Sequence, residues 1–376
     1  MLVFYLFLTK IFKYLLFKRK LLHILDNFFS NSPKIDNIQP RKLQLPADKS
    51  FHIYGARGVG KTALIVDYAD KYVKGEYLYI DCQDPTFILN DIDAQDLNEY
   101  IEEESIQTLI LDHYFEGFLD SLPNVAQLII LSREQLPLSL ESYSLYPLDF
   151  EEFLNFHSNF SLTNSFDLYT KLGSLPQVAI SQSATISARE HFFERFDAQE
   201  GKVLLILSLF HGKVTTTHQI YQRASEYFKI SKDWLYRAIK EFLAEGIIYQ
   251  IETHEKGFGK KIFLYDFLFS KYLNKNQTFL TSFDSIVTLA LIKHQISVKS
   301  IANPLGYITK DRELIIIAPF ESEENLWVKV QTNFALYTKL APSRVTILTV
   351  NSSFSFSIKE ISFQALPFYE WVVGLN

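Results

Sequence analysis

The chain has 376 residues, of which 48% are apolar and 21% charged, and its 37 Lys and Arg face 43 Asp and Glu for a net charge of −6. This globular composition excludes a wholly disordered chain, and the length predicts two or three domains. The acidic balance excludes a protein that coats nucleic acid with its whole surface, although a local basic face is compatible with it. The single cysteine, Cys82, excludes a disulfide framework and a cysteine-based zinc site, and it fits a cytoplasmic protein.

The first 20 residues, MLVFYLFLTKIFKYLLFKRK, combine a short apolar run with several basic side chains. Lys10 and Lys13 interrupt any window of about 20 residues that could span a membrane, so we expect no membrane span. Three interpretations stay open: an amphipathic helix that packs on the protein, a helix that lies on a membrane surface, and a start assigned too early. Residues 1–47 comprise this segment and a linker with three prolines.

The strongest motif is the match of residues 55–62 to G-x-x-x-x-G-K-[ST]. An apolar strand candidate, 51–54, precedes it, and a helix candidate, 62–72, follows. In such a loop the backbone N–H groups surround phosphate oxygens, the lysine bridges β- and γ-phosphates, and the threonine hydroxyl ligates Mg²⁺. The motif predicts ATP and Mg²⁺ binding by Gly55, Ala56, Arg57, Gly58, Val59, Gly60, Lys61 and Thr62.

Further strand candidates alternate with helices after the loop, at 77–81, 108–112, 127–131 and 143–146. The third of the five strands ends in Asp112, which we expect to hold Mg²⁺ through water together with Thr62. One strand separates the two motifs from each other in the expected sheet. The pattern therefore predicts an α/β fold: a P-loop NTPase core at 48–148 with a parallel five-stranded sheet of the additional-strand type.

Three later motifs carry a resemblance to a known family. Ser132-Arg133 follows a strand, PLDFEEFL occupies 147–154, and GSLP occupies 173–176. On these motifs the chain resembles the AAA+-related archaeal-type and STAND ATPases. The resemblance implies that Arg133 is the sensor residue beside Asp112, so that both are candidate catalytic residues, and that a helical lid covers 149–195. Asp149 and Glu152 have the spacing of a capping box for the first lid helix.

One departure from that family concerns hydrolysis. In its active members the acid at the end of the third strand is followed by a glutamate that polarises water, whereas His113 follows Asp112 here. Glu116 is the nearest acid. We therefore expect ATP binding with slow hydrolysis or none. Arg57 has two interpretations, a phosphate contact and a solvated side chain.

Residues 196–275 contain three helix candidates, 201–210, 216–228 and 231–245, followed by a hairpin, and they resemble a winged helix. The third helix and the wing carry the basic residues of a candidate DNA face. Asp233, Glu241 and Glu245 on the same helix weaken that interpretation, so DNA contact and protein or interdomain contact both stay open. The basic residues are Lys232, Arg237, Lys240, Lys256, Lys260 and Lys261.

Residues 280–376 resemble a restriction-nuclease-like domain, with a helix candidate at 283–294 and strand candidates at 314–318, 326–331 and 345–350. The resemblance implies that Ile315 and Trp327 occupy the positions of the two metal-binding carboxylates and that only Lys329 is retained. Without those carboxylates an Mg²⁺ site cannot form there. We therefore expect a small α/β domain, a degenerate nuclease fold without nuclease activity.

These observations favour an ATP-dependent switch whose nucleotide state repositions the later domains. A winged-helix DNA-binding regulator with ATP as effector and a ring-forming ATPase motor are the alternatives. The expected partners are ATP and an unidentified protein, with DNA contact and oligomerisation left open. Measurements of turnover rate, oligomer mass and salt-dependent DNA affinity distinguish these three functions.

Overall fold

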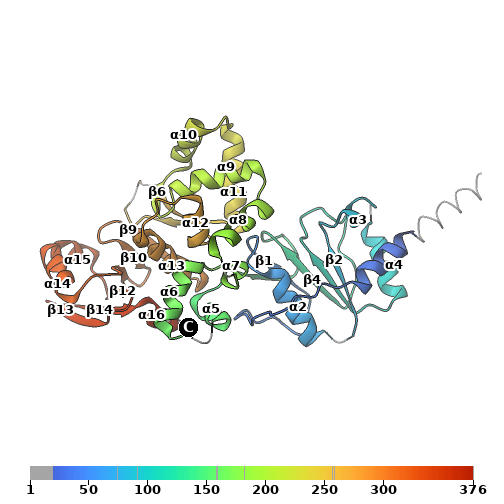
Figure 1. Cartoon of the computed structure of the whole chain (residues 1–376), viewed down its shortest axis with the longest axis horizontal. Coiled ribbons are helices and arrows are strands. Elements are labelled where there is room, and N and C mark those ends of the chain that lie inside the picture. The colour runs from blue at the N-terminus through green and yellow to red at the C-terminus, as the bar shows by residue number, and fades with distance from the viewer. Residues whose placement is uncertain are drawn as a thin grey trace, which may run out of the picture. The chain divides into compact units, whose positions relative to one another are not determined.

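The computed structural model describes residues 20–73, 75–90, 92–157, 160–181, 183–255, 257 and 259–375. These residues form two compact units (Figure 1). The first unit runs to Ala56 and continues from Gly60 to Leu145, and the second consists of Arg57–Val59 and the chain from Tyr146 onward. The membrane and start-site interpretations of residues 1–19 concern a segment outside the described residues.

The first unit is built on a five-stranded sheet in which all neighbouring strands are parallel, in the order β2-β3-β4-β1-β5. β4 lies between β1, which leads into the loop, and β3, which ends in Asp112, so the predicted additional-strand P-loop fold is confirmed. Strands β3 and β4 are buried along their whole length, as expected for the apolar runs Leu109–Leu111 and Leu128–Leu131 that form their middles. The strands are β1 (Phe51–Tyr54), β2 (Tyr77–Asp81), β3 (Thr108–Asp112), β4 (Gln127–Ser132) and β5 (Glu141–Ser144).

Helices cover this sheet and include part of the N-terminal segment. Residues 20–30 are helical, and Leu21, Ile24 and Leu25 are buried in the same apolar core as β2 and β3. Their spacing of three and four residues places them on one face of the helix, which explains why this part packs on the protein. Among the described residues no helix has the length and apolar character that crossing a membrane requires. The other helices of this unit are α2 (Lys61–Tyr72), α3 (Pro85–Ile88) and α4 (Ala94–Glu103).

The second unit begins with four helices of the expected lid region. The capping box of α5 is confirmed, because Asp149 accepts a hydrogen bond from the backbone N–H of Glu152 at 2.7 Å and the Glu152 side chain accepts one from that of Asp149 at 3.3 Å. Ser161 caps the next helix in the same manner. The helices are α5 (Phe150–Phe156), α6 (Leu162–Leu172), α7 (Pro176–Ala179) and α8 (Ala184–Arg195).

A module of three helices and a three-stranded antiparallel sheet, with strand order β6-β8-β7, follows the lid. The three helices and the hairpin lie where the sequence predicts them, whereas the short strand β6 was not expected. Lys261 is not a surface cation of the wing as predicted: it faces inward from β8 and its Nζ lies 2.5 Å from Asp284 Oδ2. The elements are α9 (Ala198–Leu209), β6 (Lys213–Thr215), α10 (Thr217–Tyr227), α11 (Lys232–Glu245), β7 (Ile248–Glu252), β8 (Lys260–Leu264) and α12 (Phe267–Leu273).

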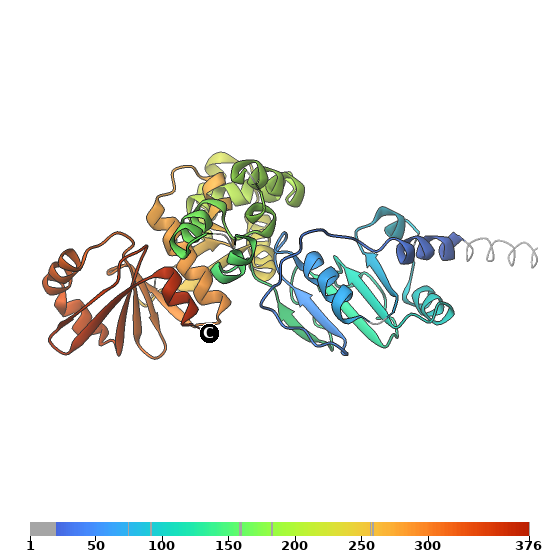
Figure 2. The same cartoon turned by 60° about the horizontal axis from the view of Figure 1, so that its bottom comes forward.

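The C-terminal part contains a mixed six-stranded sheet in the order β13-β14-β12-β11-β10-β9 (Figure 2, orange to red). α13, α16 and lid helices cover one face of it, and α14 and α15 cover the other. Its strands are β9 (Val298–Ile301), β10 (Gly306–Thr309), β11 (Glu313–Ile317), β12 (Arg344–Thr349), β13 (Phe354–Ile358) and β14 (Ile361–Pro367). Its helices are α13 (Phe279–Lys293), α14 (Glu323–Thr332), α15 (Phe334–Leu340) and α16 (Phe368–Val373).

The strand predicted at 326–331 is wrong, because these residues belong to α14. Ser322 caps that helix, acids occupy its first turn, and Leu326 and Val330, four residues apart, face the core. Trp327 and Lys329 therefore do not lie on a strand beside Ile315 of β11, and the alignment with the lysine of a nuclease strand does not hold.

Candidate nucleotide-binding site

The loop between β1 and α2 has the backbone that its glycines permit. Gly55, Gly58 and Gly60 have φ values of 156°, 79° and 94°, and α2 begins directly at Lys61. A Cβ atom on Gly55 would lie 2.3 Å from the carbonyl oxygen of Leu145, so a larger residue is excluded there. The first turn of α2 has neither a side-chain cap nor an acidic residue. Its N–H groups and partial positive charge are thus suited to an anion.

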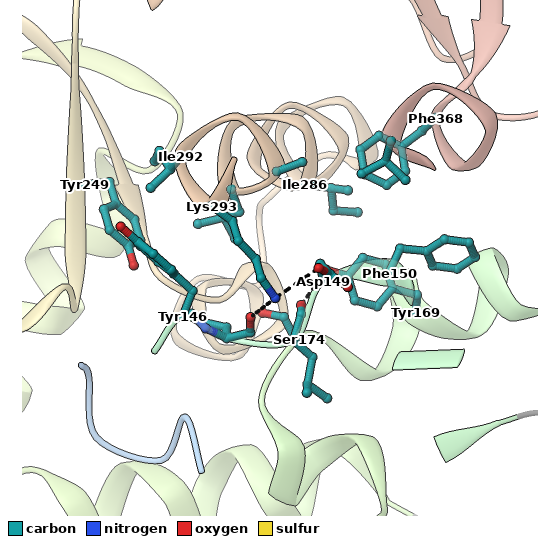
Figure 3. Close-up of a pocket in the computed structure, with 15 residues that line it drawn as sticks. Tyr146, Asp149, Phe150, Tyr169, Ser174, Tyr249, Ile286, Ile292, Lys293 and Phe368 are labelled. Carbon is teal, nitrogen blue, oxygen red and sulfur yellow. Dashed lines mark hydrogen bonds and ion pairs between the residues drawn. The ribbon is translucent and has the colours of Figure 1, made fainter. Parts of the chain in front are cut away.

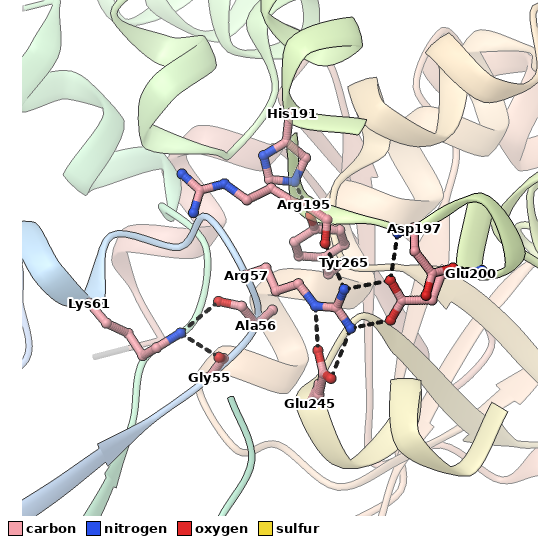
Figure 4. A network of polar contacts seen from close by, with 10 residues as sticks. All are labelled: Gly55, Ala56, Arg57, Lys61, His191, Arg195, Asp197, Glu200, Glu245 and Tyr265. Carbon is pink, nitrogen blue, oxygen red and sulfur yellow. Dashed lines mark hydrogen bonds and ion pairs between the residues drawn. The ribbon is translucent and has the colours of Figure 1, made fainter. Parts of the chain in front are cut away.

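The side chain of Lys61 lies against the loop itself. Its Nζ donates hydrogen bonds to the carbonyl oxygens of Gly55 at 2.7 Å and Ala56 at 3.0 Å (Figure 4). The residue is 8% exposed, so its ammonium group sits at the inner side of the loop. This position is the one from which a lysine reaches phosphates held by the loop.

Thr62 and Asp112, the two predicted Mg²⁺ ligands, are brought together. The Thr62 hydroxyl donates to Asp112 Oδ2 at 2.5 Å, and the carboxylate, which is fully buried, also accepts from the Tyr79 hydroxyl and the His113 N–H, each at 2.7 Å. Burial and the nearby Asp112 raise the pKa of Tyr79, so the phenol stays protonated and remains a donor. A hydroxyl and a carboxylate side by side form a hard oxygen donor set that fits Mg²⁺.

His113, which occupies the position of the family's glutamate, is paired with another acid. It has a φ of 56°, and its Nδ1 lies 2.9 Å from Asp81 Oδ1 and 3.8 Å from Asp112 Oδ1. Burial alone would raise the pKa of Asp81, but hydrogen bonds from His113 and from the Gln83 N–H outweigh it and lower that pKa. The imidazole is thus held by the end of the neighbouring strand β2.

Asp81 was not identified from the sequence as a site residue. The register of β2 and β3 pairs Asp81 with Asp112, so the two acids end adjacent parallel strands at the same edge of the sheet. The signal was present, because YLYID at 77–81 ends in an acid in the same manner as TLILD at 108–112.

Arg133 follows β4 at the edge of the sheet where the loop begins. Ser132 is paired in register with Tyr54, the last residue of β1, so Arg133 and Gly55 continue from neighbouring positions. The Ser132 hydroxyl lies 2.7 Å from His52 Nε2, and burial lowers the pKa of His52 to about 4. The imidazole is therefore neutral at physiological pH and adds no charge beside the loop.

Arg57 is fixed by acidic residues of the module that follows the lid (Figure 4). Its Nη1 and Nη2 donate to Glu200 at 2.8 and 2.6 Å, and its Nε and Nη2 donate to Glu245 at 2.9 and 3.0 Å. Nη1 also donates to the carbonyl oxygen of Arg195 at 2.6 Å, and the guanidinium lies 4.8 Å from the Phe196 ring centroid. We call Arg57, Glu200 and Glu245 the arginine clasp.

The clasp uses the whole hydrogen-bonding capacity of Arg57. A guanidinium has five N–H donors, and the five contacts above occupy them, so none remains for a phosphate. The side chain is 6% exposed, so the solvated interpretation of Arg57 is wrong. Its backbone N–H is still part of the loop.

Gly58 packs closely against the side chain of His191 on α8. A Cβ atom there would lie 2.3 Å from His191 Cε1, and the φ of 79° also disfavours a side chain. Burial, followed by the charges of Arg195 and Arg57, lowers the pKa of His191 to about 3, so this imidazole is neutral. The tip of the loop, Arg57–Val59, belongs to the second unit, and Gly60–Thr62 belong to the first.

The PLDFEEFL segment is anchored to the C-terminal domain. Lys293 of α13 forms ion pairs with Asp149, at 3.0 Å, and with Glu152 (Figure 3). The cavity beside these residues has a volume of about 20 Å³, enough for about one water molecule, so it is not a ligand site. The capping box therefore also links the first lid helix to α13.

Comparisons with known proteins agree with this geometry. Residues 47–126 match a family described as an AAA domain. None of the curated proteins compared with the chain matches it.

Three solved structures match the chain at low similarity. A Walker-type ATPase of Pyrococcus abyssi shares 12% identity at a TM-score of 0.40, with 68% of this chain and 94% of that chain covered. The ORC1 protein of Aeropyrum pernix in complex with DNA shares 12% identity at a TM-score of 0.30, covering 69% of this chain and 91% of that chain. Drosophila ORC bound to AT-rich DNA and Cdc6 shares 13% identity at a TM-score of 0.20, with 61% of this chain and 87% of that chain covered.

The similarities to solved structures are too low to bear on function, whereas the family match covers the loop, Asp112 and three of the five strands. The sheet order and the loop geometry agree with that match. The chain therefore contains an AAA-type domain with a P-loop fold at residues 47–126.

Proposed function

We propose that the chain is an ATP-dependent switch that binds ATP with Mg²⁺ at residues 55–62 and hydrolyses it slowly or not at all. Lys61 would contact the phosphates, and Thr62 and Asp112 would hold Mg²⁺, which supplies the positive charge that neutralises the phosphates. Asp112 and Arg133 are the candidate catalytic residues at the same sheet edge.

One observation carries the switch: the eight residues of the loop are divided between two units. Lys61 and Thr62 begin α2, whereas the side chain of Arg57 is bound by α9 and α11. Phosphates that engage the loop act on the same short backbone segment that carries the clasp. A difference in loop conformation between the nucleotide-free and nucleotide-bound states would therefore reach Glu200 and Glu245 directly.

The expectation of slow hydrolysis is supported by His113. Its ring is held by Asp81, and its positive φ turns the chain at the place where the family's glutamate stands. A histidine restrained in this way is a poor substitute for a carboxylate that accepts a proton from water.

The element order α9-β6-α10-α11-β7-β8 supports the interpretation of this module as a winged helix. In the switch it is the element that responds to nucleotide. A DNA-binding regulator with ATP as effector is the second candidate, because Lys232, Arg237 and Lys240 are exposed on α11.

The test is hydrogen exchange of the full chain with and without ATP–Mg²⁺. We expect ATP to change exchange in the first turn of α9 and the last turn of α11, and Arg57→Ala to abolish that change. ATP affinity should stay within about threefold, because the Arg57 side chain has no donor left for phosphate. Arg57→Lys, which keeps the charge but loses the fork geometry, should weaken the response.

Arg223→Ala is the matched control, since Arg223 forms an exposed pair with Glu226 on α10, within the same module. It should leave the exchange response intact. A wild-type chain that does not bind ATP contradicts the proposal, and so does a full exchange response in folded Arg57→Ala.

A further inference from the structure

A groove of about 530 Å³ lies where the wing strand meets the C-terminal sheet. It is bounded by the end of β7, the start of β9, the turn between β10 and β11, and the end of α15. Thr253 forms a parallel bridge with Ser300, and the His254 N–H donates to the Ser300 carbonyl oxygen at 2.9 Å. These backbone contacts join the two walls, so the groove is a built feature of this unit.

The groove is strongly basic although the chain as a whole is acidic. Lys299, Lys310, Arg312 and Lys339 line it, and Glu252 is the only carboxylate among the described lining residues. Within the described chain none of the four cations forms an ion pair, and Arg312 donates to the Leu340 carbonyl oxygen at 3.0 Å. Asp311 lies in the same turn but does not line the groove. The local balance is thus four cations against one acid, in a chain of net charge −6.

We infer that this groove binds the sugar–phosphate backbone of duplex nucleic acid. Four exposed cations, distributed over strand β9, the turn between β10 and β11, and helix α15, match a ligand with several separated negative charges. Three of the four are lysines, which contact phosphates as point charges and carry no base specificity.

Two features of the lining distinguish duplex from other ligands. No Phe, Tyr or Trp is among the described residues of the groove, so single-stranded bases would find no stacking platform. Glu252 and His254 are the only carboxylate and imidazole among its described lining residues, too few to hold a metal ion, so the inference is one of binding alone. We therefore expect binding that is independent of sequence and strongly dependent on salt.

The groove differs from the face of α11, which sequence patterns indicated as a DNA contact. On α11 the basic residues alternate with Asp233 and Glu241, and Lys232 lies 5.5 Å from the Tyr236 ring centroid. Matched triple variants of the full chain can distinguish the contributions of the groove and of the α11 face to duplex binding. The inference does not depend on the proposed switch, because nucleotide is absent from its test.

The experiment measures binding of a fluorescent 20-base-pair duplex by anisotropy at several salt concentrations. Lys299→Ala/Lys310→Ala/Lys339→Ala should weaken binding about tenfold or more and reduce the slope of log K against log salt by about 3. Lys232→Ala/Arg237→Ala/Lys240→Ala removes the same charge from α11 and should weaken binding less than about threefold. All six side chains are exposed, so both variants should fold, which circular dichroism checks.

A single strand of the same length should bind more weakly than the duplex, and polyglutamate should not compete at equal charge. The inference is overturned if the wild-type chain does not bind duplex, if the α11 variant loses as much as the groove variant, or if the groove variant binds normally. Tighter binding of the single strand or of polyglutamate also overturns it and assigns the groove to that ligand.

Discussion

Two buried aspartates, Asp112 in the first unit and Asp284 in the second, have similar neighbours and different electrostatics. Each accepts a hydrogen bond from a tyrosine hydroxyl, from Tyr79 at 2.7 Å and from Tyr307 at 2.5 Å. Asp284 also has the ammonium group of Lys261 at 2.5 Å, whereas the described residues pair Asp112 with no lysine or arginine. The nearest titratable base to Asp112 is His113, at 3.8 Å.

The carboxylates of Asp284 and Asp112 are thus compensated in different ways, one by a cation and the other by neutral donors. A buried carboxylate is costly unless a cation or several donors compensate it. Asp284 is compensated by Lys261 and links α13 to β8, so its charge is used within the fold. The hydrogen bonds that the described residues make to Asp112 come from neutral donors, one of which is the Thr62 hydroxyl, so under the proposed function its charge is the one that would hold Mg²⁺.

The largest expected effect is on Asp284. Asp284→Asn leaves Lys261 buried without its counter-charge and should lower the free energy of unfolding by about 3–5 kcal/mol. Asp112→Asn keeps an acceptor for the Thr62 and Tyr79 hydroxyls and loses the one for the His113 N–H, so it should lower that free energy by only about 1–2 kcal/mol while abolishing Mg²⁺-dependent ATP binding. Urea unfolding of both variants measures the contrast.

A double variant provides the control for this contrast. Lys261→Met with Asp284→Asn removes both charges and should recover a large part of the lost stability. Equal destabilisation by Asp112→Asn and Asp284→Asn would remove the distinction between the two aspartates.

A smaller effect is expected for Lys61. Lys61→Ala removes a charge-assisted phosphate contact and should weaken ATP binding by about 1.5–3 kcal/mol, measured by calorimetry. Lys71→Ala is the matched control on the same helix, because Lys71 is 52% exposed and paired only with Asp67. Unchanged ATP affinity in Lys61→Ala would contradict the assignment of the loop.

The sheet and the loop of the first unit could be predicted from the sequence because their signals are local. The loop motif and the strand that ends in Asp112 each occupy a few consecutive residues, as does the Asp149 capping box of the second unit, and the structure places them as expected. The arginine clasp could not be predicted, since the partners of Arg57 lie 138 to 188 residues away along the chain.

The wrong strand at 326–331 has a different cause. The run Leu-Trp-Val-Lys-Val suits a strand or a helix, and the signal that decides for the helix lies before it, in Ser322 followed by two glutamates. Lys261 was misplaced because a lysine near a wing suggests a surface, whereas its partner Asp284 belongs to another element. Local pattern therefore predicts elements better than it predicts which charges meet.

The third prediction concerns turnover. His113→Glu restores the carboxylate that active members of the family carry and should raise ATP turnover about tenfold, a gain of about 1.4 kcal/mol. The gain is below the full contribution of a general base because the backbone at residue 113 has a positive φ of 56°. A steady-state phosphate-release assay measures it, and a wild-type rate in the usual enzyme range of about 1–1000 per second would contradict the slow-hydrolysis proposal.

The smallest effect is expected at Asp81, the second acid at the sheet edge beside Asp112. Its pKa is lowered by the hydrogen bonds from His113 and Gln83 against the opposing effect of burial, so its ionised form stabilises the fold. That contribution is present above the pKa of an unfolded aspartate, about 3.9, and is lost as the pH falls through the lower pKa of the folded state. Because the side chain is 40% exposed, the contribution should stay below about 1 kcal/mol.

Asp81→Asn should therefore be slightly less stable than the wild-type chain at pH 7, and the difference should shrink as the pH falls below the pKa of an unfolded aspartate, about 3.9. Urea midpoints of the two proteins at a series of pH values measure it. Protonation of His52, whose pKa burial lowers to about 4, destabilises both proteins equally on acidification and cancels from the difference. A difference that grows on acidification would mean that Asp81 is stabilised in its protonated form, and the pairing with His113 would then not explain its role.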